Sequence, residues 1–377
     1  MAGGAKCWLM EFLSGSEMIA KGAIAAGCRA FFGYPITPSS EIMELMSEGL
    51  PKVGGVFRQM EDEIAASAAA IGASWAGAKA MTATSGPGAS LMQENIGMAT
   101  MLEIPLVVVN AQRMGPSTGV PTVGSQQDLM QAIWGRHGDQ LLLVLCPSTF
   151  GELFTMTIKA FNWAEMMRTP VILLTDGHLV NLRSSVSMDQ AYEIVDRKML
   201  DAKDATAPFK TDESLVPGFP PLGKEFNVLL DTLSHDERGY PTPNSAKTES
   251  LLVRLKAKLE RNIDKIWMHE ESDVSDSEEI VISYGSSAIS ARRAVDIARS
   301  RGKKIALLVM KTMWPLDEGH MRRILKGKKR IIVVEQALGQ LAWLIRPFAD
   351  DSEVVTVTSL GRPPRPKKIE QVILNEG

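Results

Sequence analysis

The sequence contains few cysteines and few histidines for its length. Only three cysteines occur in 377 residues, at Cys7, Cys28 and Cys146, and they form no CxxC pair. Because an iron–sulfur cluster usually takes four thiolates, this chain by itself is not expected to hold one. The five histidines have no HxH or HExxH spacing, so no metal site is predicted from them.

A charge excess of one sign and a long apolar run are also lacking. The 41 basic and 44 acidic side chains give a net charge of −3, so nothing points to nucleic acid or an anionic membrane as a partner. The longest apolar runs, at 141–146 and 171–174, fall far below the roughly 18 residues of a membrane-spanning helix. Residues 1–12 show no export signal, and few cysteines fit a reducing compartment. We therefore expect a cytoplasmic protein.

The first half of the chain alternates helical patterns with short apolar runs. Ser14 and Glu17 have the spacing of a capping box that opens the first helix, and Ser40 is expected to cap the next. Expected helices then cover 64–76 and the stretch after Gly88 as far as Met101. The runs that indicate buried strands lie at 29–32, 56–59, 80–84, 106–110, 141–145 and 171–175. This alternation predicts an α/β fold, with a parallel sheet covered by helices on both faces.

The middle of the chain breaks this rhythm. Residues 196–244 contain six prolines among many polar residues, which indicates an irregular excursion, and a charged helix is expected at 248–268. The acidic stretch 270–279 is interpreted as a linker. A second series of strands (280–284, 305–309, 331–335) and helices (289–301, and one from near Gly339) then predicts a smaller α/β domain. The expected units are therefore 1–195, 196–275 and 276–377.

A Gly-Pro-Ser-Thr-Gly motif at 115–119 matches GxSxG, the nucleophile elbow of α/β-hydrolases. That elbow needs a helix directly after it, whereas Val-Pro-Thr-Val-Gly follows here, and no convincing Asp and His complete a triad. The motif is therefore interpreted as a ligand-binding loop or a simple turn.

A second glycine-rich segment, Ser-Gly-Pro-Gly at 85–88, follows a predicted strand and precedes a predicted helix. Backbone N–H groups at such a position can face an anion. The segment matches neither GxGxxG nor GxxxxGK[ST], which argues against nicotinamide dinucleotide and P-loop sites, and a tight turn explains it equally well.

The acidic run Glu61, Asp62 and Glu63 lies at a strand-to-helix junction. Acids are favoured in the first turn of any helix by its dipole, which accounts for the run without a function. Glu63, however, leads into an unusually small and apolar helix, where its carboxyl group would be partly desolvated and could act in proton transfer.

Arg113 follows an apolar strand and precedes the glycine-rich 115–119 loop. Open α/β sheets bind ligands at the carboxyl ends of their strands, and a guanidinium there suits a carboxylate through paired hydrogen bonds. An ordinary surface arginine at a strand end remains the alternative.

Several segments, in order along nearly the whole chain, resemble the α subunits of 2-oxoacid:ferredoxin oxidoreductases. The most specific is Gly-Tyr-Pro-Ile-Thr-Pro-Ser-Ser-Glu at 33–41, and the 115–119 loop is most similar to the 2-oxoglutarate branch. The other segments that carry the resemblance lie at 60–66, 84–88, 113–122, 134–139, 160–165, 234–239, 282–286 and 333–340.

This resemblance implies a fold, cofactors and partners. It implies a pyrimidine-binding domain of the thiamine-diphosphate enzymes, followed by a smaller α/β domain similar to the C-terminal domain of transketolase. The family oxidises 2-oxoacids to acyl-CoA and carbon dioxide with thiamine diphosphate, coenzyme A and iron–sulfur clusters, and passes electrons to ferredoxin. A separate β subunit is implied to supply the diphosphate-binding domain with Mg²⁺ and a [4Fe-4S] cluster, and γ and δ subunits are possible further partners.

The resemblance also implies roles for single residues. Glu63 matches the glutamate that hydrogen-bonds the aminopyrimidine ring of the cofactor and favours its imino tautomer. Pro35 matches a residue that lines the cofactor, Ile36 lies in the same substrate loop, and Thr37 matches a hydroxyl near the substrate's keto and carboxylate oxygens. Arg113 matches the arginine that binds the substrate carboxylate.

The chain departs from the family pattern at Met114, at Asp-Gly-His 176–178 and at Gln336-Ala337. The first two departures affect the choice of 2-oxoglutarate, and the third affects any contact with coenzyme A. Two alternatives stay open at this point: an enzyme for branched-chain or aromatic 2-oxoacids, and a non-catalytic scaffold in an electron-transfer complex.

Overall fold

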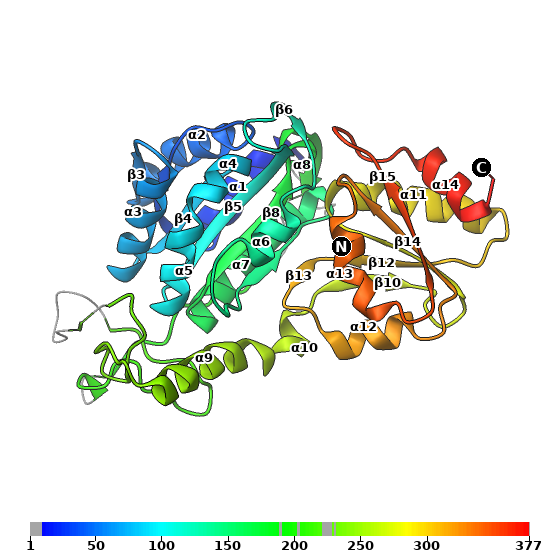
Figure 1. Ribbon diagram of the computed structural model, residues 1–377. Helices are drawn as coiled ribbons and strands as arrows, with labels where there is room; N and C mark the ends of the chain where they lie inside the picture. Colours follow the sequence, from blue (N-terminus) through cyan, green and yellow to red (C-terminus); the bar gives the residue numbers. More distant parts are fainter. Residues whose placement is uncertain (1–9, 188–190, 202–203, 221–227, 230, 377) are drawn as a thin grey trace, which may run out of the picture.

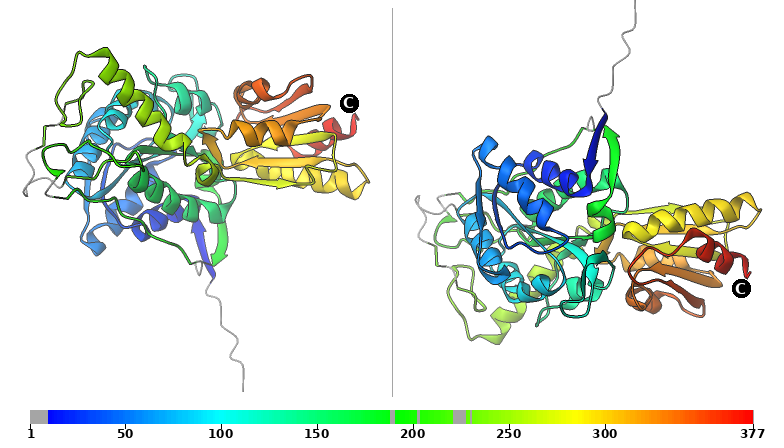
Figure 2. Two further views of the ribbon diagram at one scale, coloured as in Figure 1. Left: turned by 90° about the horizontal axis from the view of Figure 1, so that it is seen from below. Right: turned by 90° about the horizontal axis from the view of Figure 1, so that it is seen from above.

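Two sheets with their own helices lie side by side in the computed structural model (Figures 1 and 2). The structure describes residues 10–187, 191–201, 204–220, 228–229 and 231–376. Within these ranges, no helix combines the length and the apolar character needed to cross a membrane.

The larger sheet has the strand order β13-β7-β8-β5-β4-β2-β3, with β6 paired to β5. All neighbouring strands are parallel except β13, which is antiparallel to β7, and β6, which is antiparallel to β5. Its strands are β2 (Cys28–Gly33), β3 (Val56–Gln59), β4 (Lys79–Thr84), β5 (Leu106–Met114), β6 (Val120–Gly124), β7 (Leu143–Leu145), β8 (Pro170–Asp176) and β13 (Thr312–Trp314).

Helices cover both faces of this sheet, as the alternation of its strands requires. In β5, Val107 and Val109 pack in one core with α1 (Gly15–Ala25), α2 (Ser40–Gly49) and α7 (Phe150–Met167). Leu106 and Val108 point to the other face, in a core with α3 (Glu63–Trp75), α5 (Gln93–Met101) and α6 (Leu129–Trp134). The expected doubly covered parallel sheet is therefore confirmed.

The smaller sheet has the order β10-β12-β11-β14-β15, parallel except for β10 at its edge. Its strands are β10 (His269–Ser272), β11 (Glu279–Ser283), β12 (Ala306–Met310), β14 (Arg330–Glu335) and β15 (Glu353–Thr358). Its helices are α11 (Gly285–Ser300), α12 (Glu318–Leu325), α13 (Gln340–Ile345) and α14 (Pro366–Leu374). This second α/β unit is confirmed as well.

The remaining short elements connect or flank the two sheets. A two-stranded antiparallel sheet joins β1 to β9 at the margin of the larger sheet. These elements are β1 (Met10–Ser14), β9 (Arg183–Ser187), α4 (Gly86–Leu91), α8 (Gly177–Asn181), α10 (Ile263–Ile266) and the 3-10 turns Pro51–Val53 and Arg346–Phe348.

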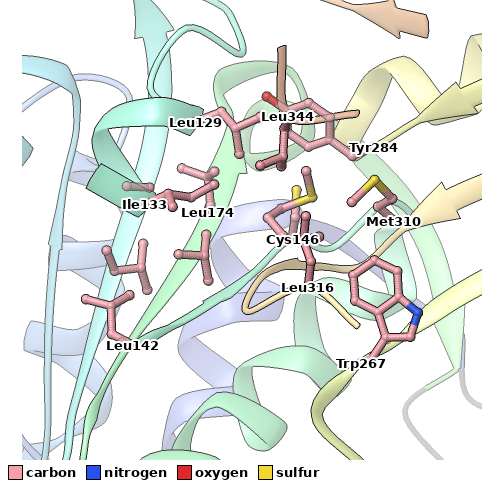
Figure 3. Close-up of a cluster of buried hydrophobic side chains, with 14 of the residues drawn as sticks. Leu129, Ile133, Leu142, Cys146, Leu174, Trp267, Tyr284, Met310, Leu316 and Leu344 are labelled. Atoms are coloured by element: carbon pink, nitrogen blue, oxygen red, sulfur yellow. The ribbon is translucent and has the colours of Figure 1, made fainter. Parts of the chain in front are cut away.

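One continuous core spans both units (Figure 3). Leu129 and Ile133 of α6 belong to the same buried cluster as Tyr284, Met310 and Leu344 from the later sequence. Shared apolar burial of this kind fixes the two sheets against each other, because separating them would expose side chains that are now out of water.

Gln126 adds a polar connection between the units. Its side-chain amide donates to the Tyr284 carbonyl at 2.9 Å, and its Oε1 accepts from the Ser287 hydroxyl at 2.8 Å and from the Gln336 N–H at 2.9 Å. The Tyr284 hydroxyl donates in turn to the Gln126 carbonyl at 3.1 Å. Because these groups are buried, breaking the contact would leave several of them unsatisfied.

Helix α9 (Ser245–Glu260) follows the excursion, runs along the first unit (Figure 1) and is held there by buried charges. Glu103 is fully buried and pairs with Arg254 at 2.5 Å and Lys258 at 2.7 Å, both from α9. Burial alone would raise the pKa of Glu103, but the charges of Lys258 and Arg254 lower it to about 2. These ion pairs fix α9 against the turn before β5.

Most expected elements are present, with local differences. The capping box of Ser14 and Glu17 is confirmed. Ser40 is the first residue of α2 rather than its cap, and Ser39 occupies that position. The helix expected up to Met101 is divided into α4 and α5, and the helix expected at 248–268 into α9 and α10.

Two differences concern the expected unit boundaries. The acidic stretch interpreted as a linker begins inside β10, an edge strand of the smaller sheet. Strand β13, from the later sequence, pairs with β7 and so belongs to the larger sheet. The prediction missed both because each pairing joins segments far apart in sequence. The division at 195 and 275 stays a prediction.

Candidate functional site

The expected site residues meet at one edge of the larger sheet. Strands β5, β4, β2 and β3 are neighbours and parallel, so their carboxyl ends lie together. The loop with Pro35, Ile36 and Thr37 follows β2, Ser85 follows β4, and Arg113 lies near the end of β5. Glu63 begins α3, shortly after β3.

The three consecutive acidic residues at 61–63 differ in how far they are buried. Asp62 is the N-cap of α3, and its carboxylate accepts the Ala65 N–H at 2.7 Å, which is the structural role expected for an acid there. Glu61 is exposed. Glu63 alone is buried, with 5% of its surface exposed, and none of the described residues donates a hydrogen bond to its carboxylate.

The Glu63 carboxylate lies directly against Gly88 in the first turn of α4. A Cβ on Gly88 would come within 2.3 Å of the Glu63 Oε1 and within 2.2 Å of the Thr84 Oγ1. Glycine is therefore required for this close approach. Within the described part of the chain, the buried hydroxyls of Thr84 and Ser85 also have no hydrogen-bond partner.

Arg113 links two loops at this edge. It is 5% exposed, and its guanidinium donates to the Thr37 carbonyl at 2.9 Å and to the Thr118 carbonyl at 3.0 Å. Its Nε is buried without a partner among the described residues. Because a guanidinium has five N–H donors, the two loop contacts leave donors for a ligand.

Sequence reasoning missed Asp128, which lies beside Arg113. Its carboxylate accepts from the Asn110 amide at 3.3 Å and from the Gly86 backbone N–H. Burial raises the pKa of Asp128 to about 6, although these hydrogen bonds and the Arg113 charge act in the opposite direction. No local pattern marked it, because its surroundings come from β5, α4 and the start of α6.

The contact with Asp128 also distinguishes between the two interpretations of the Ser-Gly-Pro-Gly segment at 85–88. The sequence left open an anion site or a tight turn. The Gly86 N–H binds the chain's own Asp128 carboxylate, and Gly86 has a φ of +36°, which a residue with a side chain rarely adopts. The segment therefore carries a turn that holds an internal carboxylate.

The loop after β2 has exposed side chains and is contacted through the Thr37 carbonyl by Arg113. Pro35 and Thr37 are exposed, and Ile36 is partly buried. Ser39 fixes the loop from below, because its hydroxyl donates to the Ile36 carbonyl at 2.9 Å. The loop thus combines a held backbone with accessible side chains, as a ligand-binding loop needs.

The hydrolase interpretation of the 115–119 motif is excluded by its surroundings. Strand β6 begins at Val120, directly after the motif, where a nucleophile elbow needs a helix. Ser117 is exposed and Gly119 has a φ of +55°. The motif forms the turn between β5 and β6.

Two of the departures from the family pattern have structural explanations. Asp176 caps α8 through the His178 and Leu179 N–H groups and also accepts the Ser286 N–H of α11 at 2.9 Å, so it joins the two units. Gln336 is fully buried and donates to the Ser286 hydroxyl at 2.6 Å. Nothing in the structure explains Met114.

The donor set at this edge fits one half of a thiamine cofactor. A buried carboxylate without an internal partner, next to unpartnered hydroxyls, suits an aminopyrimidine ring that both donates and accepts hydrogen bonds. Among the described residues, no group of three metal-binding side chains lies here; the one such group is far along the chain, at His269, Glu271 and His320.

Two family models match the chain, and one of them is described as thiamine diphosphate-binding. The pyruvate flavodoxin/ferredoxin oxidoreductase thiamine diphosphate-binding family matches residues 21–254, and the pyruvate:ferredoxin oxidoreductase core domain II family matches residues 277–367.

Among curated proteins, the 2-oxoglutarate synthase subunit KorA of Methanocaldococcus jannaschii is 44% identical over 367 residues, 97% of this chain and 99% of that protein. The ketoisovalerate oxidoreductase subunit VorB of Methanothermobacter thermautotrophicus is 33% identical, over 93% of each chain.

Among solved structures, the 2-oxoglutarate:ferredoxin oxidoreductase of Magnetococcus marinus, with 2-oxoglutarate, coenzyme A and succinyl-CoA bound, has a TM-score of 0.94 and 32% identity. That match covers all of this chain and 67% of the other. A split-gene transketolase, at a TM-score of 0.56 and 11% identity, shares the fold alone.

Proposed function

The chain belongs to the pyruvate flavodoxin/ferredoxin oxidoreductase family, and from that premise we propose that it is the α subunit of a 2-oxoglutarate:ferredoxin oxidoreductase. In the proposed reaction 2-oxoglutarate loses its carboxylate as carbon dioxide, and the remaining acyl group forms a thioester with the coenzyme A sulfur. The two electrons pass one at a time to ferredoxin, and the thiol proton is released.

The observation that carries the proposal is the buried Glu63 carboxylate at the same sheet edge as Arg113. An enzyme of this class needs one group that holds a proton position on the aminopyrimidine and another that binds a substrate carboxylate. Thiamine diphosphate, when bound, supplies the electron sink for decarboxylation.

Glu63 is assigned as the group that hydrogen-bonds the aminopyrimidine ring and holds a proton position on it. Its side chain is mostly buried and lies directly against Gly88, so a hydrogen bond from the carboxylate to a ring nitrogen would form there with little competition from solvent. Pro35, exposed in the loop after β2, is assigned to the wall of the cofactor site.

Arg113, Thr37 and Ile36 are assigned to the 2-oxoacid. Arg113 already holds the Thr37 carbonyl, so the guanidinium and the Thr37 side chain are kept in one neighbourhood. A guanidinium with unused N–H donors binds a carboxylate by charge-assisted hydrogen bonds.

The partner and cofactor assignments are those that the family resemblance implies. A β subunit is proposed to bind the cofactor diphosphate with Mg²⁺ and to carry a [4Fe-4S] cluster, with γ and δ subunits as further members. Coenzyme A and ferredoxin act as co-substrates, and a cytoplasmic location is part of the proposal. The subunit names of the relatives support a multi-subunit enzyme.

Exposed apolar side chains support contact with another subunit. Leu338 is 78% exposed, Trp343 69% and Trp134 54%. Trp134 and Trp343 line one groove, in which Trp134 also stacks edge-on against Trp314 at 4.7 Å. Large apolar side chains gathered in this way are typical of surfaces that a partner covers.

Four relatives named 2-oxoglutarate synthase subunit KorA are 40–44% identical to this chain, whereas a relative named for ketoisovalerate and another named for 2-oxoglutarate are each 33% identical. The four higher identities favour 2-oxoglutarate. The test is to purify the chain with its β subunit and to measure acyl-CoA formation and ferredoxin reduction with 2-oxoglutarate, pyruvate and 2-oxoisovalerate. The highest kcat/KM is expected for 2-oxoglutarate. A preference for 2-oxoisovalerate would establish the branched-chain alternative, and no turnover in a cofactor-loaded complex would establish the scaffold.

A further inference from the structure

Two histidines and a glutamate far from the site described above converge at the edge of the smaller sheet. The Glu271 Oε2 lies 3.6 Å from the His269 Nε2 and 3.5 Å from the His320 Nε2. One ligand atom from each of the three residues falls within 4.8 Å of the other two. The two imidazole rings are 4.5 Å apart, centre to centre.

The fold brings these side chains together from separate elements. His269 and Glu271 are two residues apart on the edge strand β10, so they point to the same side. His320 comes from the first turn of α12, where the cap residue Asp317 accepts its backbone N–H at 2.8 Å. The sequence showed only separated histidines, which explains why it predicted no metal site.

The donor atoms and their spacing suit a small divalent cation. Imidazole nitrogen with carboxylate oxygen is a ligand set for Zn²⁺, with bonds of about 2.0–2.2 Å, which places neighbouring ligand atoms about 3.3 Å apart. The two measured Glu271 distances are close to that value. Furthermore, the His320 Nε2 is buried and has no hydrogen-bond partner among the described residues, although it faces this cluster.

We propose that His269, Glu271 and His320 form a binding site for one divalent transition-metal ion, with Zn²⁺ the best suited, in addition to the proposed oxidoreductase function. Zn²⁺ suits two imidazoles and one carboxylate, and a water molecule completes the fourth position. The bound ion ties the edge strand β10 to α12, the helix that follows β13 in the chain.

Arg323 competes with this ion. It lies one turn after His320 and donates to the His320 Nδ1 at 2.9 Å. Because arginine can only donate, Nδ1 must accept, and neutral His320 then carries its proton on Nε2, the atom the metal needs. Arg323 is exposed and can turn away. Metal binding therefore requires Arg323 to release His320.

The other charges around the cluster leave the site available for a cation. Lys311 pairs with Glu152 at 2.6 Å, and Glu270, 3.7 Å from Lys311, pairs with Arg292 at 2.7 Å, so each of these charges has a partner of opposite sign. Asp317 adds negative charge at the start of α12.

The experiment is equilibrium dialysis of the full chain, in its complex with the β subunit, against Zn²⁺, with zinc per chain measured by elemental analysis. The wild type is expected to bind one zinc ion that Glu271→Gln and His320→Gln lose. Arg323→Gln is expected to bind zinc about 10-fold more tightly, since residues that contact a ligating histidine typically change metal affinity by 10–100-fold. His137→Gln is the matched control, because His137 is an exposed histidine outside the cluster, and it should leave zinc binding unchanged.

If a ligand variant fails to fold, the Arg323→Gln variant still tests the proposal. Arg323 is an exposed side chain, so its replacement should leave the fold intact. Zinc content that stays the same in Glu271→Gln or His320→Gln would overturn the proposal. It would also be overturned if Arg323→Gln bound zinc no more tightly than the wild type, or if the wild type bound no zinc.

Discussion

Gly88 and Glu63 approach so closely that any side chain at position 88 would collide with the Glu63 carboxylate, at 2.3 Å from its Oε1. A Cβ at position 88 could be accommodated only if the Glu63 carboxylate and the Thr84 hydroxyl both moved away. The present position of the Glu63 carboxylate therefore depends on the absence of a side chain at position 88.

The first prediction is that Gly88→Ala abolishes most turnover by displacing Glu63. Overpacking a filled site typically costs about 1–3 kcal/mol of stability, so the variant should still assemble with the β subunit. The measurement is kcat of the assembled complex. Gly72→Ala is the matched control: Gly72 lies exposed within α3, its Cβ would meet nothing within 4 Å, and alanine there should stabilise the chain by about 0.5–1 kcal/mol. Normal turnover in Gly88→Ala would contradict the requirement for glycine.

Glu63→Gln is the second prediction, paired with Glu61→Gln. Glutamine keeps the size of Glu63 but cannot take and return a proton, so kcat should fall by about 10²–10⁴-fold for every 2-oxoacid. Glu61 is exposed, and its glutamine variant should retain full activity. If Glu63→Gln turns over normally in a cofactor-loaded complex while Glu61→Gln does not, the roles of the two acids are reversed.

The third prediction concerns Arg113. Arg113→Ala removes a charge-assisted contact to the substrate carboxylate, worth roughly 1.5–3 kcal/mol, so KM should rise by about 10–150-fold. Because Arg113 also holds the Thr37 and Thr118 carbonyls, kcat should fall to a smaller extent as the loops loosen. Arg113→Lys keeps the charge but not the fork of donors, and an intermediate KM is expected. An unchanged KM in Arg113→Ala would remove this residue from the substrate site.

The sequence could predict features that depend on local pattern. Strands such as β8 and β12 contain continuous apolar runs, and Glu63 stands before a run of small residues, so both features were accessible to inspection. Asp128 was not, because three distant segments create its surroundings. The same reason applies to β13, a short strand whose pairing with β7 joins residues 312 and 145.

The fourth prediction is that the isolated chain binds no iron–sulfur cluster. Cys28 and Cys146 are buried in different cores, on opposite faces of the larger sheet, so they cannot reach the same cluster. Burial raises the pKa of the Cys28 thiol to about 12, which disfavours the thiolate that iron requires. Cys7 lies outside the described residues. Elemental analysis of the purified chain checks this, and a stoichiometric cluster on this polypeptide alone would falsify the assignment of clusters to partner subunits.

The last prediction uses the pKa of Asp128, which burial raises from 3.8 to about 6 in the folded chain. Between these values the folded state binds more protons than the unfolded state, so the contribution of Asp128 to stability falls as the pH rises from about 4 to 6. Above pH 6 the ionised carboxylate costs up to about 3 kcal/mol.

Asp128→Asn removes that cost, so its free energy of unfolding in urea should exceed the wild-type value at pH 7.5. The gain should shrink as the pH falls and vanish only below about pH 3, where the wild-type carboxyl is protonated in both the folded and the unfolded state. Asp62→Asn is the control. Asp62 is exposed, and its carboxylate stabilises the start of α3 at neutral pH, so replacing it with an amide should not raise the free energy of unfolding. A difference between wild type and Asp128→Asn that does not vary with pH would show that this carboxyl titrates normally.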